Sequence, residues 1–526
     1  MAGLDRATLL ALGAMALAVF VIANDVTALS VALPDIESDF DSDVTTVQWV
    51  INAYALIFGV LIVTGGRLAD MFGRRRLFFI GAAIFALFSV LGGAAQDELW
   101  LIVCRALMGI GGAIMWPAAL GMTYDVLPAD KAGLAGGLII GVAGFGNAAG
   151  PLLGGALTEA VSWRAIMYLN LPIAALACFA TWRAIDESKS DTGRERIDYA
   201  GIASLSVGLI ALLVALDQVT DWGWSDPRIL GLFALCVLLL VAFAINERRA
   251  GSWALIPRDV MANADFRAAC IATLMMSAVF FASLLFLPQF FQKILGYSPL
   301  EAGAGLLPMM AVFAITSFVA GGLYARLGPK LIVSAGAVCL TLGAFLVSLI
   351  ERDSGFTALV PGMVIMGIGV GLFYSSITTA AVTALDPSRS SLAGGIVYMF
   401  QVAGGSVGLG LTTTVFITAS EDQLQGSLDG SGLRNSEIDA LHGALAGTES
   451  AAEILSRFSA EAADRILELV REAFAAGMQW AFRLVAVLAF VGLVISVLFV
   501  GGSLLRSRGG AGTTADTAGA ATETAP

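Results

Sequence analysis

The sequence predicts an all-α polytopic membrane protein, and three observations support this fold class. Of the 526 residues, 58% are hydrophobic and only 13% are charged, whereas the surface of a soluble protein needs roughly twice that share of charged residues. Apolar stretches long enough to cross a bilayer recur along most of the chain. In addition, a segment of the first half is repeated in the second half, which indicates two related bundles of helices.

We expect fourteen transmembrane helices in this sequence, because crossing about 30 Å of hydrocarbon takes about 20 apolar residues. The first stretch is too long for a secretory signal and lacks a basic leader, since Asp5 and Arg6 precede it. The predicted spans, in chain order, are 8–33, 45–69, 76–96, 99–123, 132–157, 165–184, 198–217, 228–246, 267–291, 301–325, 330–350, 356–384, 391–419 and 479–505.

Two segments that align without a gap reveal the internal repeat. Met108–Gly137 and Met366–Gly395 both begin with Met-Gly-Ile-Gly and both end with Leu-Ala-Gly-Gly. Such a duplication predicts an N-terminal six-helix bundle over 1–190 and a C-terminal six-helix bundle over 251–505. The two helices within 191–250 have no counterpart in either copy, so we interpret them as an inserted pair that links the bundles.

Two regions are expected to lie outside the bilayer. Within 420–478, apolar residues such as Ile454, Phe458 and Leu469 recur at helical spacing among charged residues, which predicts an amphipathic helix on the outer surface. Residues 506–526 lack apolar periodicity, so we expect a disordered cytoplasmic tail. The 5 cysteines fall inside predicted spans and are too scattered to form a disulfide framework or a metal cluster.

The distribution of charge predicts the orientation of the chain. Most lysines and arginines in short loops fall on one side of the predicted spans, with a cluster at 74–76. Short cytoplasmic loops are enriched in such residues, so we expect both termini in the cytoplasm and the chain in the inner or plasma membrane of the cell. The net charge of −12 lies largely in the outer segments 35–43 and 420–478, which argues against nucleic acid as a partner.

The segment Gly66–Arg76, GRLADMFGRRR, places an acid and three arginines between two apolar stretches. An acid so close to lipid is costly unless it has a partner. The segment resembles the loop signature of the major facilitator superfamily of secondary transporters. The matching residues are Gly66, Leu68, Ala69, Asp70, Gly73, Arg74 and Arg75.

This resemblance implies that the loop is a conformational latch. Asp70 would meet the free amides and the positive dipole end of the helix that starts near Ser390, and would hold the two bundles together on the cytoplasmic side. Arg74 and Arg75 would tie Asp70 to the loop. The alternative is a basic loop that fixes topology and has no further role.

Asp25 is the acid that we place near the middle of a span, where a carboxylate is expensive and functional by default. It lies in FVIANDVTALSVALP, which resembles the first-helix signature of the fourteen-span drug:proton antiporters. Apolar surroundings disfavour the charged form, so Asp25 is the leading candidate for proton coupling or for meeting a cationic ligand. Hydrogen bonding to Asn24 or Thr27, which would only fix helix packing, is the alternative.

Arg105 in the fourth span resembles the Arg-x-x-x-Gly element of the same superfamily. It cannot lose its charge, so its role must be electrostatic, beside an acid that titrates. The alternative is an arginine that merely extends its head to the outer membrane surface. Glu159, near a helix end, is a further candidate for proton coupling.

Small residues line the predicted fifth span, 132–157. Glycines at intervals of four let helix backbones approach closely, and the proline bends the helix. This span closely resembles the antiporter signature of exporters, which uptake carriers of the superfamily usually lack, although close packing alone would also account for the glycines. In the second copy, Leu409 occupies the place of the proline. The matching residues are Gly146, Gly150, Pro151, Gly154 and Gly155.

These resemblances imply a proton-coupled multidrug efflux antiporter that exports lipophilic small molecules by alternating access, confers antibiotic resistance, and works as a monomer without cofactor or metal. The sequence has no Gly-Lys-Ser/Thr phosphate loop and no catalytic residue set, so we expect neither an ATP-driven pump nor an enzyme. An uptake permease of the same fold and a membrane sensor that has lost transport remain alternatives. The candidate ligand contacts are Asn24, Asp25, Asn52, Tyr54, Met115, Trp116, Phe286, Gln289, Tyr374 and Gln401.

Overall fold

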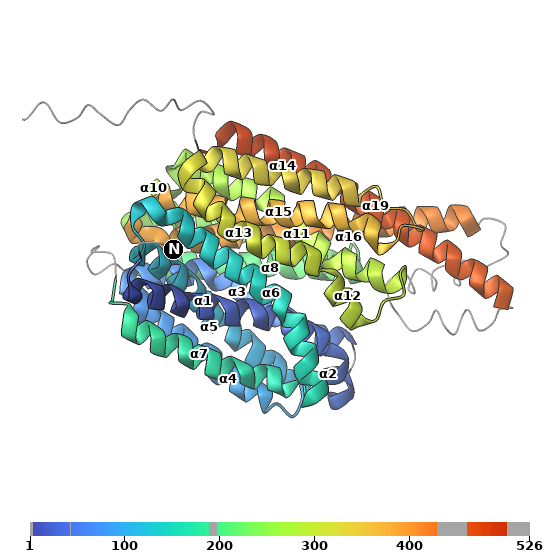
Figure 1. Cartoon of the computed structure of the whole chain (residues 1–526), viewed down its shortest axis with the longest axis horizontal. Helices are drawn as coiled ribbons and strands as arrows, with labels where there is room; N and C mark the ends of the chain where they lie inside the picture. The colour runs from blue at the N-terminus through green and yellow to red at the C-terminus, as the bar shows by residue number, and fades with distance from the viewer. Residues whose placement is uncertain (1–3, 43, 189–196, 429–459, 502–526) are drawn as a thin grey trace, which may run out of the picture.

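The computed structural model describes residues 4–42, 44–188, 197–428 and 460–501, and these ranges contain helices and no strand. Among them, 14 helices are long and apolar enough to cross a membrane, which confirms the predicted fold class and number of spans. The spanning helices are α1 (Arg6–Val31), α3 (Val44–Phe72), α4 (Arg74–Gly93), α5 (Glu98–Val126), α6 (Ala132–Ala160), α7 (Arg164–Ala184), α8 (Tyr199–Trp222), α9 (Pro227–Ala250), α11 (Ala264–Lys293), α13 (Leu307–Leu327), α14 (Pro329–Val347), α15 (Phe356–Thr383), α16 (Ser390–Leu428) and α19 (Ala460–Phe499) (Figure 1). Shorter helices are α2 (Leu33–Phe40), α10 (Arg258–Ala262) and α12 (Pro299–Gly305).

Local sequence signals explain where several helices begin and end. At the start of α5, the Asp97 side chain accepts a hydrogen bond from the backbone N–H of Trp100 (2.7 Å), and at the start of α11, Asn263 accepts from Phe266 (3.0 Å). These caps satisfy N–H groups that a helix leaves unpaired at its start. Between α3 and α4, Gly73 adopts a φ of 106°, which favours glycine, so a single residue joins the two helices.

The helices form two groups with the same internal packing. In Figure 1 the N-terminal group, coloured blue to cyan, lies beside the C-terminal group, coloured yellow to red. α5 packs against α3 and α4 in the first group, and α15 packs against α13 and α14 in the second; α1 pairs with α6 as α11 pairs with α16. This repeated packing order is what the duplication seen in the sequence requires. The groups meet where α6 contacts α13 and α15, and where α16 contacts α3 and α5.

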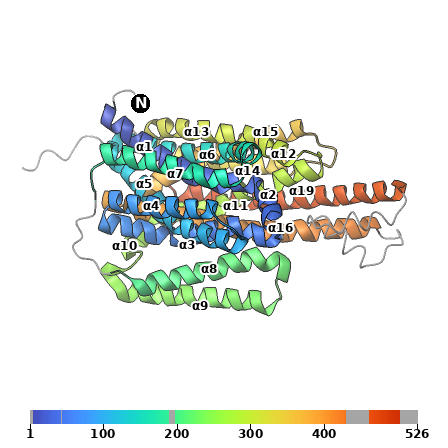
Figure 2. The ribbon, with the colours of Figure 1, turned by 90° about the horizontal axis from the view of Figure 1, so that it is seen from below.

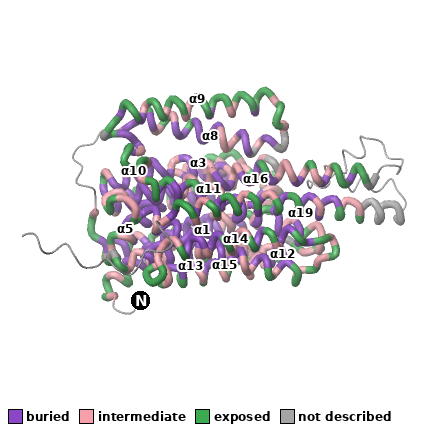
Figure 3. Tube along the Cα trace, turned by 90° about the horizontal axis from the view of Figure 1, so that it is seen from above, coloured by how far each residue is buried: buried purple, intermediate pink, exposed green. Residues whose placement is uncertain are grey.

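Helices α8 and α9 lie beside the two groups (Figure 2). α8 contacts α9 on one side and α16 and α3 on the other. α9 is largely exposed along its length (Figure 3), with apolar side chains such as Val237 (62% exposed) and Leu238 (65% exposed) on its surface. An apolar exposed face of this size suits a helix that borders lipid.

The predicted span 301–325 corresponds to the apolar span Leu300–Leu327 of the structure, but it is not one continuous helix. The predicted span 301–325 is divided at Leu306 into α12 and α13. Pro308 lies in the first turn of α13. A proline there supplies no backbone N–H to continue a helix from α12 but fits the first turn of a new one.

The predicted outer segment 420–478 also differs from the expectation of a separate surface helix. Residues 420–428 are the end of α16, and residues 460–478 are the beginning of α19, which continues into the last span. Both helices extend beyond the others at the end of the molecule opposite the N-terminus (Figure 2). Part of the apolar face of this region packs on α16, since the ring of Phe474 is buried 5.0 Å from that of Phe416. Residues 429–459, with Ile454 and Phe458, and the predicted tail 506–526 lie outside the described residues.

Two glycines allow α6 and α13 to touch at the boundary between the groups. A Cβ atom on Gly321 would lie 2.5 Å from the carbonyl oxygen of Gly133, and a Cβ atom on Gly133 would lie 2.5 Å from that of Gly321. The neighbouring Gly322 has no atom within 4 Å of its Cβ position. The pair Gly321 and Gly322 therefore offers a matched test of this close approach.

We predict that Gly321→Ala lowers the midpoint of thermal unfolding of the purified protein, because overfilling a tight contact costs about 1–3 kcal/mol. Gly322→Ala should leave the midpoint unchanged or raise it slightly, since alanine favours helix over glycine by about 1 kcal/mol. A thermal-shift assay in detergent compares the two variants. Equal destabilisation by both would contradict the close contact between α6 and α13.

Candidate functional site

A buried ion pair lies within the N-terminal group. Asp25 of α1 and Arg105 of α5 are both 0% exposed, and Arg105 Nη1 donates to Asp25 Oδ2. Arg105 also donates through Nε to the backbone oxygen of Val50 (2.9 Å), and its guanidinium carbon lies 4.4 Å from the ring centre of Tyr54. The sequence indicated Asp25 and Arg105 separately, and the fold brings them together. Each side chain neutralises the charge of the other. An unpaired charge in this apolar interior would be far more costly.

Two residues that the sequence analysis missed complete this cluster. Asn170 of α7 donates from Nδ2 to Asp25 Oδ1 (2.7 Å) and to Ser89 Oγ of α4 (3.0 Å). Ser89 Oγ in turn donates to the backbone oxygen of Met167 (2.6 Å). The sequence signal that could have identified Asn170 is a polar amide within the otherwise apolar span predicted at 165–184. Glu159, the other candidate for proton coupling, is exposed in the last turn of α6.

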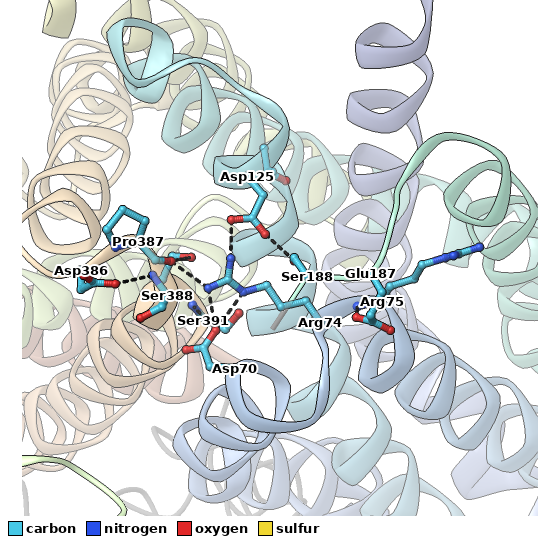
Figure 4. Close-up of polar contacts among 12 residues, drawn as sticks. Asp70, Arg74, Arg75, Asp125, Glu187, Ser188, Asp386, Pro387, Ser388 and Ser391 are labelled. Atoms are coloured by element: carbon cyan, nitrogen blue, oxygen red, sulfur yellow. Dashed lines mark hydrogen bonds and ion pairs between the residues drawn. The ribbon is translucent and has the colours of Figure 1, made fainter. Parts of the chain in front are cut away.

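A second cluster lies at the end of the molecule that carries the arginines 74–76, which we call the arginine-rich end. Asp70, in the last turn of α3, accepts hydrogen bonds from the backbone N–H groups of Ser391 (3.3 Å) and Leu392 (2.8 Å) at the start of α16 (Figure 4). These N–H groups have no partner inside their own helix and mark the positive end of its dipole, so they stabilise a carboxylate. The contact expected near Ser390 is therefore present, and it joins the two groups of helices.

Arg74 connects Asp70 to two further elements. Its guanidinium lies between Asp70 and Asp125 of α5 (Figure 4); it donates to Asp70 Oδ1 (2.9 Å), to Asp125, and to the backbone oxygen of Pro387 (2.9 Å). Asp125 also accepts from Ser188 Oγ (2.6 Å). Asp125 and Pro387 were missed by the sequence analysis, because neither lies at a recognisable spacing from the Asp70 motif. One buried arginine thus links α3, α4 and α5 to the segment that precedes α16.

The expectation that Arg75 ties Asp70 to the loop is not supported. The Arg75 side chain donates to the backbone oxygen of Trp182 (3.0 Å), and the backbone N–H groups of Arg75 and Arg76 donate to Glu187 (3.0 Å each). Consecutive residues on a helix point about 100° apart, so Arg74 and Arg75 cannot both face Asp70. Arg75 instead joins the start of α4 to the end of α7 and to Glu187, which follows it.

Gly66 and Ser390, the other residues assigned to the latch, lie at the same contact. A Cβ atom on Gly66 would lie 2.5 Å from the backbone oxygen of Ser391, so the absence of a side chain lets α3 and α16 approach. Ser390 Oγ donates to the backbone oxygen of Pro387 (3.1 Å) at the start of α16.

The glycine and proline residues of the antiporter signature lie mainly where α6 crosses α1. A Cβ atom on Gly150 would lie 3.0 Å from the Ala28 nitrogen and would overlap the Thr27 hydroxyl. Cβ atoms on Gly146 and Gly154 would also meet α1, the first at 3.0 Å from Ala23 Cβ and the second against the Ala28 oxygen. Gly155 has only ordinary contacts, the nearest at 3.5 Å. Pro151 lies against α12, since a Cβ atom on Gly303 would be 3.5 Å from its Cβ.

The matching position of the second copy is packed just as closely, although leucine replaces the proline there. A Cβ atom on Gly408 of α16 would lie 2.7 Å from the Ala278 Cα of α11. The close crossing is therefore a property of both copies, and the proline alone is particular to the first.

Some predicted ligand contacts lie between the two groups. The ring of Trp116 lies 5.0 Å from that of Tyr398 on α16, and the ring of Phe58 on α3 lies 5.4 Å from the same tyrosine. Tyr54 instead covers Arg105, and Asn24 is buried beside α6. Phe58 and Tyr398 were missed because an aromatic residue in an apolar span carries no signal of its own.

Other predicted contacts face the interior of their own group. Met115 is 0% exposed, and a Cβ atom on Gly81 would lie 2.9 Å from the Met115 nitrogen, so the backbone of α5 lies against α4 at this residue. The ring of Phe286 lies 5.2 Å from that of Phe416, and the Tyr374 hydroxyl donates to Ser277 Oγ (3.1 Å). Three predicted contacts are partly buried: Asn52, Gln289 and Gln401.

A cavity of about 480 Å³ opens between α16 and α19. None of the predicted ligand contacts lines it. Its lining residues are Thr414, Val415, Thr418, Ala419, Asp422, Gln423, Ala476 and Trp480.

Twelve of the 14 spans form two related groups, which contain a buried acid–arginine pair and an acid that binds a helix end across the groups. Together these features define a membrane transport protein built from a duplicated bundle. The sequence profile of the Major Facilitator Superfamily matches residues 15–409. The chain belongs to this family.

Similar proteins are export and resistance proteins of bacteria. The tetracenomycin C resistance and export protein of Streptomyces glaucescens is 29% identical over 494 residues, which cover 92% of this chain and 90% of that protein. The puromycin resistance protein pur8 of Streptomyces alboniger is 35% identical over 397 residues (74% and 78%). Multidrug resistance protein 3 of Bacillus subtilis is 29% identical over 498 residues (93% and 94%).

A solved structure shares the fold. The human organic anion transporter MFSD10 (TETRAN) superposes with a TM-score of 0.62 at 12% identity, covering 94% of this chain and all of that chain. The relatives and the 14 spans agree with the fourteen-span drug:proton antiporter type indicated by the sequence.

We predict that Asp70→Asn increases hydrogen exchange at the start of α16, because the amide lacks the charge that stabilises the N–H groups of Ser391 and Leu392. Hydrogen bonds to a charged group contribute about 1.5–3 kcal/mol, so the exchange rate of these amides should rise about tenfold or more. Mass spectrometry of a peptide that covers residues 390–395 measures this exchange rate. Glu187→Gln changes a carboxylate of the same region that does not contact α16, and should leave this peptide unchanged. Unaltered exchange in the Asp70 variant would rule out the stabilising contact.

Proposed function

We propose that this protein is a proton-coupled exporter that moves lipophilic small molecules out of the cell by alternating access. The observation that carries the proposal is the fully buried Asp25–Arg105 pair. A titratable acid inside a span, facing a cation that keeps its charge, suits a group that binds and releases a proton. The relatives support the direction and the substrate class, because their names describe resistance to and export of antibiotics.

We further propose that the arginine-rich end and both termini face the cytoplasm, since short loops rich in lysine and arginine stay on that side. In this orientation the contacts of Asp70 with Ser391 and Leu392 close the cytoplasmic side between the two groups of helices. Substrate would then leave from the opposite end, and these contacts would have to break before the next substrate molecule enters.

Proton binding at Asp25 would act through the ion pair. A neutral Asp25 no longer balances Arg105, so the attraction between α1 and α5 falls. α1 packs on α6, and α6 contacts α13 and α15 of the other group. A change at Asp25 can therefore shift the balance between two arrangements of the groups, which is what coupling of a proton to transport requires.

The aromatic residues between the groups suit a lipophilic ligand. Phe58 and Trp116 belong to the N-terminal group, and Tyr398 belongs to the C-terminal group. Aromatic rings offer large apolar surface with little rotamer entropy to lose, and binding sites for lipophilic compounds are mostly apolar. Both groups are supplied by one chain, so we propose that a monomer suffices for transport.

Everted membrane vesicles from a host that lacks its own efflux pumps test the direction of transport. With an acidic interior, an exporter should accumulate ethidium, tetraphenylphosphonium or puromycin and release protons as each compound is added. An uptake permease would instead carry these compounds outward with the protons. Absence of both accumulation and proton release for the whole set would contradict the proposal.

We predict that Asp25→Asn abolishes proton-driven accumulation in these vesicles while the protein still folds and inserts, because the amide cannot exchange a proton. Glu159→Gln removes an exposed acid at a helix end and should retain most of the activity. Both variants are compared at matched abundance in the membrane. Full activity of Asp25→Asn, or equal losses in both variants, would remove Asp25 from the coupling role.

We also predict that Gly150→Ala reduces resistance of the host to the transported compounds at least tenfold more than Gly155→Ala does. Gly150 lies against the backbone of α1 at Asn24 and Ala28, one and three residues from Asp25, so an added methyl group must displace the helix that carries the acid. Gly155 has room for the methyl group. The measurement is the minimum inhibitory concentration at equal expression, and equal effects would show that the crossing of α1 and α6 does not limit transport.

A further inference from the structure

Each oxygen of Asp25 has a donor of its own. Arg105 of α5 donates to Oδ2, and Asn170 of α7 donates to Oδ1 at 2.7 Å. All three side chains are fully buried, since Asp25, Arg105 and Asn170 are each 0% exposed. The carboxylate therefore receives one charged and one neutral hydrogen bond, from two different helices.

We propose that Asn170 is a positioning residue that sets the proton affinity of Asp25, and that Ser89 fixes the orientation of the Asn170 amide. This inference rests on the proposed role of Asp25 as the proton carrier. An N–H group that donates to a carboxylate stabilises the charged form of that group more than it stabilises the protonated form. Asn170 thus favours release of the proton in the arrangement where the Asp70 contact is closed.

Ser89 explains why the amide nitrogen, and not the amide oxygen, faces Asp25. The Ser89 hydroxyl uses its hydrogen for the backbone oxygen of Met167 (2.6 Å), so towards Asn170 its oxygen can only accept. The NH₂ group of Asn170 has two hydrogens and serves both Ser89 (3.0 Å) and Asp25 (2.7 Å). The Asn170 oxygen has no hydrogen-bond partner in the structure. A turned amide would give up both hydrogen bonds of the nitrogen.

The other groups near Asp25 leave Asn170 a distinct role. α1 packs against α2, α3, α5, α6 and α7. Within the described residues of these helices, the charged group that contacts Asp25 is Arg105, and the titratable Tyr54 lies against the Arg105 guanidinium. The remaining charged groups of these helices lie towards helix ends: Asp35, Glu37, Asp39, Arg67, Asp70, Glu98, Asp125, Glu159, Arg164 and Arg183.

The same hydrogen bond gives proton uptake a structural consequence. Asn170 connects α7 to α1 directly, and through Ser89 it connects both to α4. A protonated Asp25 is a weaker acceptor, so the link between α1 and α7 weakens together with the ion pair to α5. Proton binding thereby loosens α1 from two neighbours at once.

Infrared spectroscopy of the purified protein tests the inference without any substrate. The intensity of the carbonyl band of protonated carboxyl groups is measured as a function of pH. The contribution of Asp25 is the part of this band that is present in the parent protein and absent from the Asp25→Asn variant. Asn170→Leu keeps the side-chain size and removes the donor, so the charged form of Asp25 is less stable and the proton stays bound to higher pH. We expect the midpoint to rise by about one pH unit, which is a tenfold increase in proton affinity.

Two further variants separate positioning from a general effect on folding. Ser89→Ala frees the amide to turn and should raise the midpoint in the same direction by a smaller amount. Thr181→Val replaces another polar residue of α7 that is 0% exposed and does not contact Asp25, and should leave the midpoint unchanged. The Ser89 variant also tests the proposal should Asn170→Leu fail to fold.

The outcomes distinguish this inference from the proposed function. An Asp25 band with the same midpoint in the parent, Asn170→Leu and Ser89→Ala would overturn the role of Asn170 and leave Asp25 as proton carrier. An equal shift in Thr181→Val would also overturn it. If Asp25→Asn removes no band at any pH where the protein is folded, Asp25 does not titrate, and the inference falls together with proton coupling through Asp25.

Discussion

A charge buried among apolar helices must find its partner inside the protein, and much of the N-terminal group is arranged to meet this requirement. Asp25 and Arg105 neutralise each other; Arg105 Nε also donates to the backbone of α3, and Asp25 Oδ1 accepts from an amide of α7. Four helices, α1, α3, α5 and α7, thus contribute to the hydrogen bonds of one ion pair. Because breaking a buried pair by removing one member is far more costly than the pair itself is stabilising, this cluster fixes how α1, α5 and α7 lie relative to one another.

The two halves of the chain contribute different chemistry to the contacts between them. The side-chain charges come from the N-terminal group, with Asp70 and Arg74 at the boundary. The C-terminal group contributes backbone atoms to these contacts, namely the N–H groups of Ser391 and Leu392 and the oxygen of Pro387. Backbone groups at a helix start hold a carboxylate without any cation of their own. The duplicated folds are therefore similar in packing and unequal in electrostatics.

Several features of the site were predictable because they depend on single residues in their local context. An acid in the first span, an arginine in the fourth and an acid followed by arginines after the second stand out against apolar neighbours, since lipid makes such residues expensive. Asn170 and Asp125 carried weaker signals: an amide inside a span and an acid near a helix end are both common. Their importance comes from the partner they meet, and Arg75 shows the reverse case, a residue in a strong motif that faces away from Asp70.

The sequence by itself determined the membrane class, the fourteen spans, the duplicated organisation and the residues too polar for their surroundings. These properties follow from transfer free energies and periodicity, which are summed along the chain. Only the tertiary structure decided that Asp25 meets both Arg105 and Asn170, that Arg74 rather than Arg75 holds Asp70, and that residues 460–478 continue into the last span. Those outcomes depend on which helices cross and at what rotation, and glycines such as Gly150 set that geometry by letting two backbones touch.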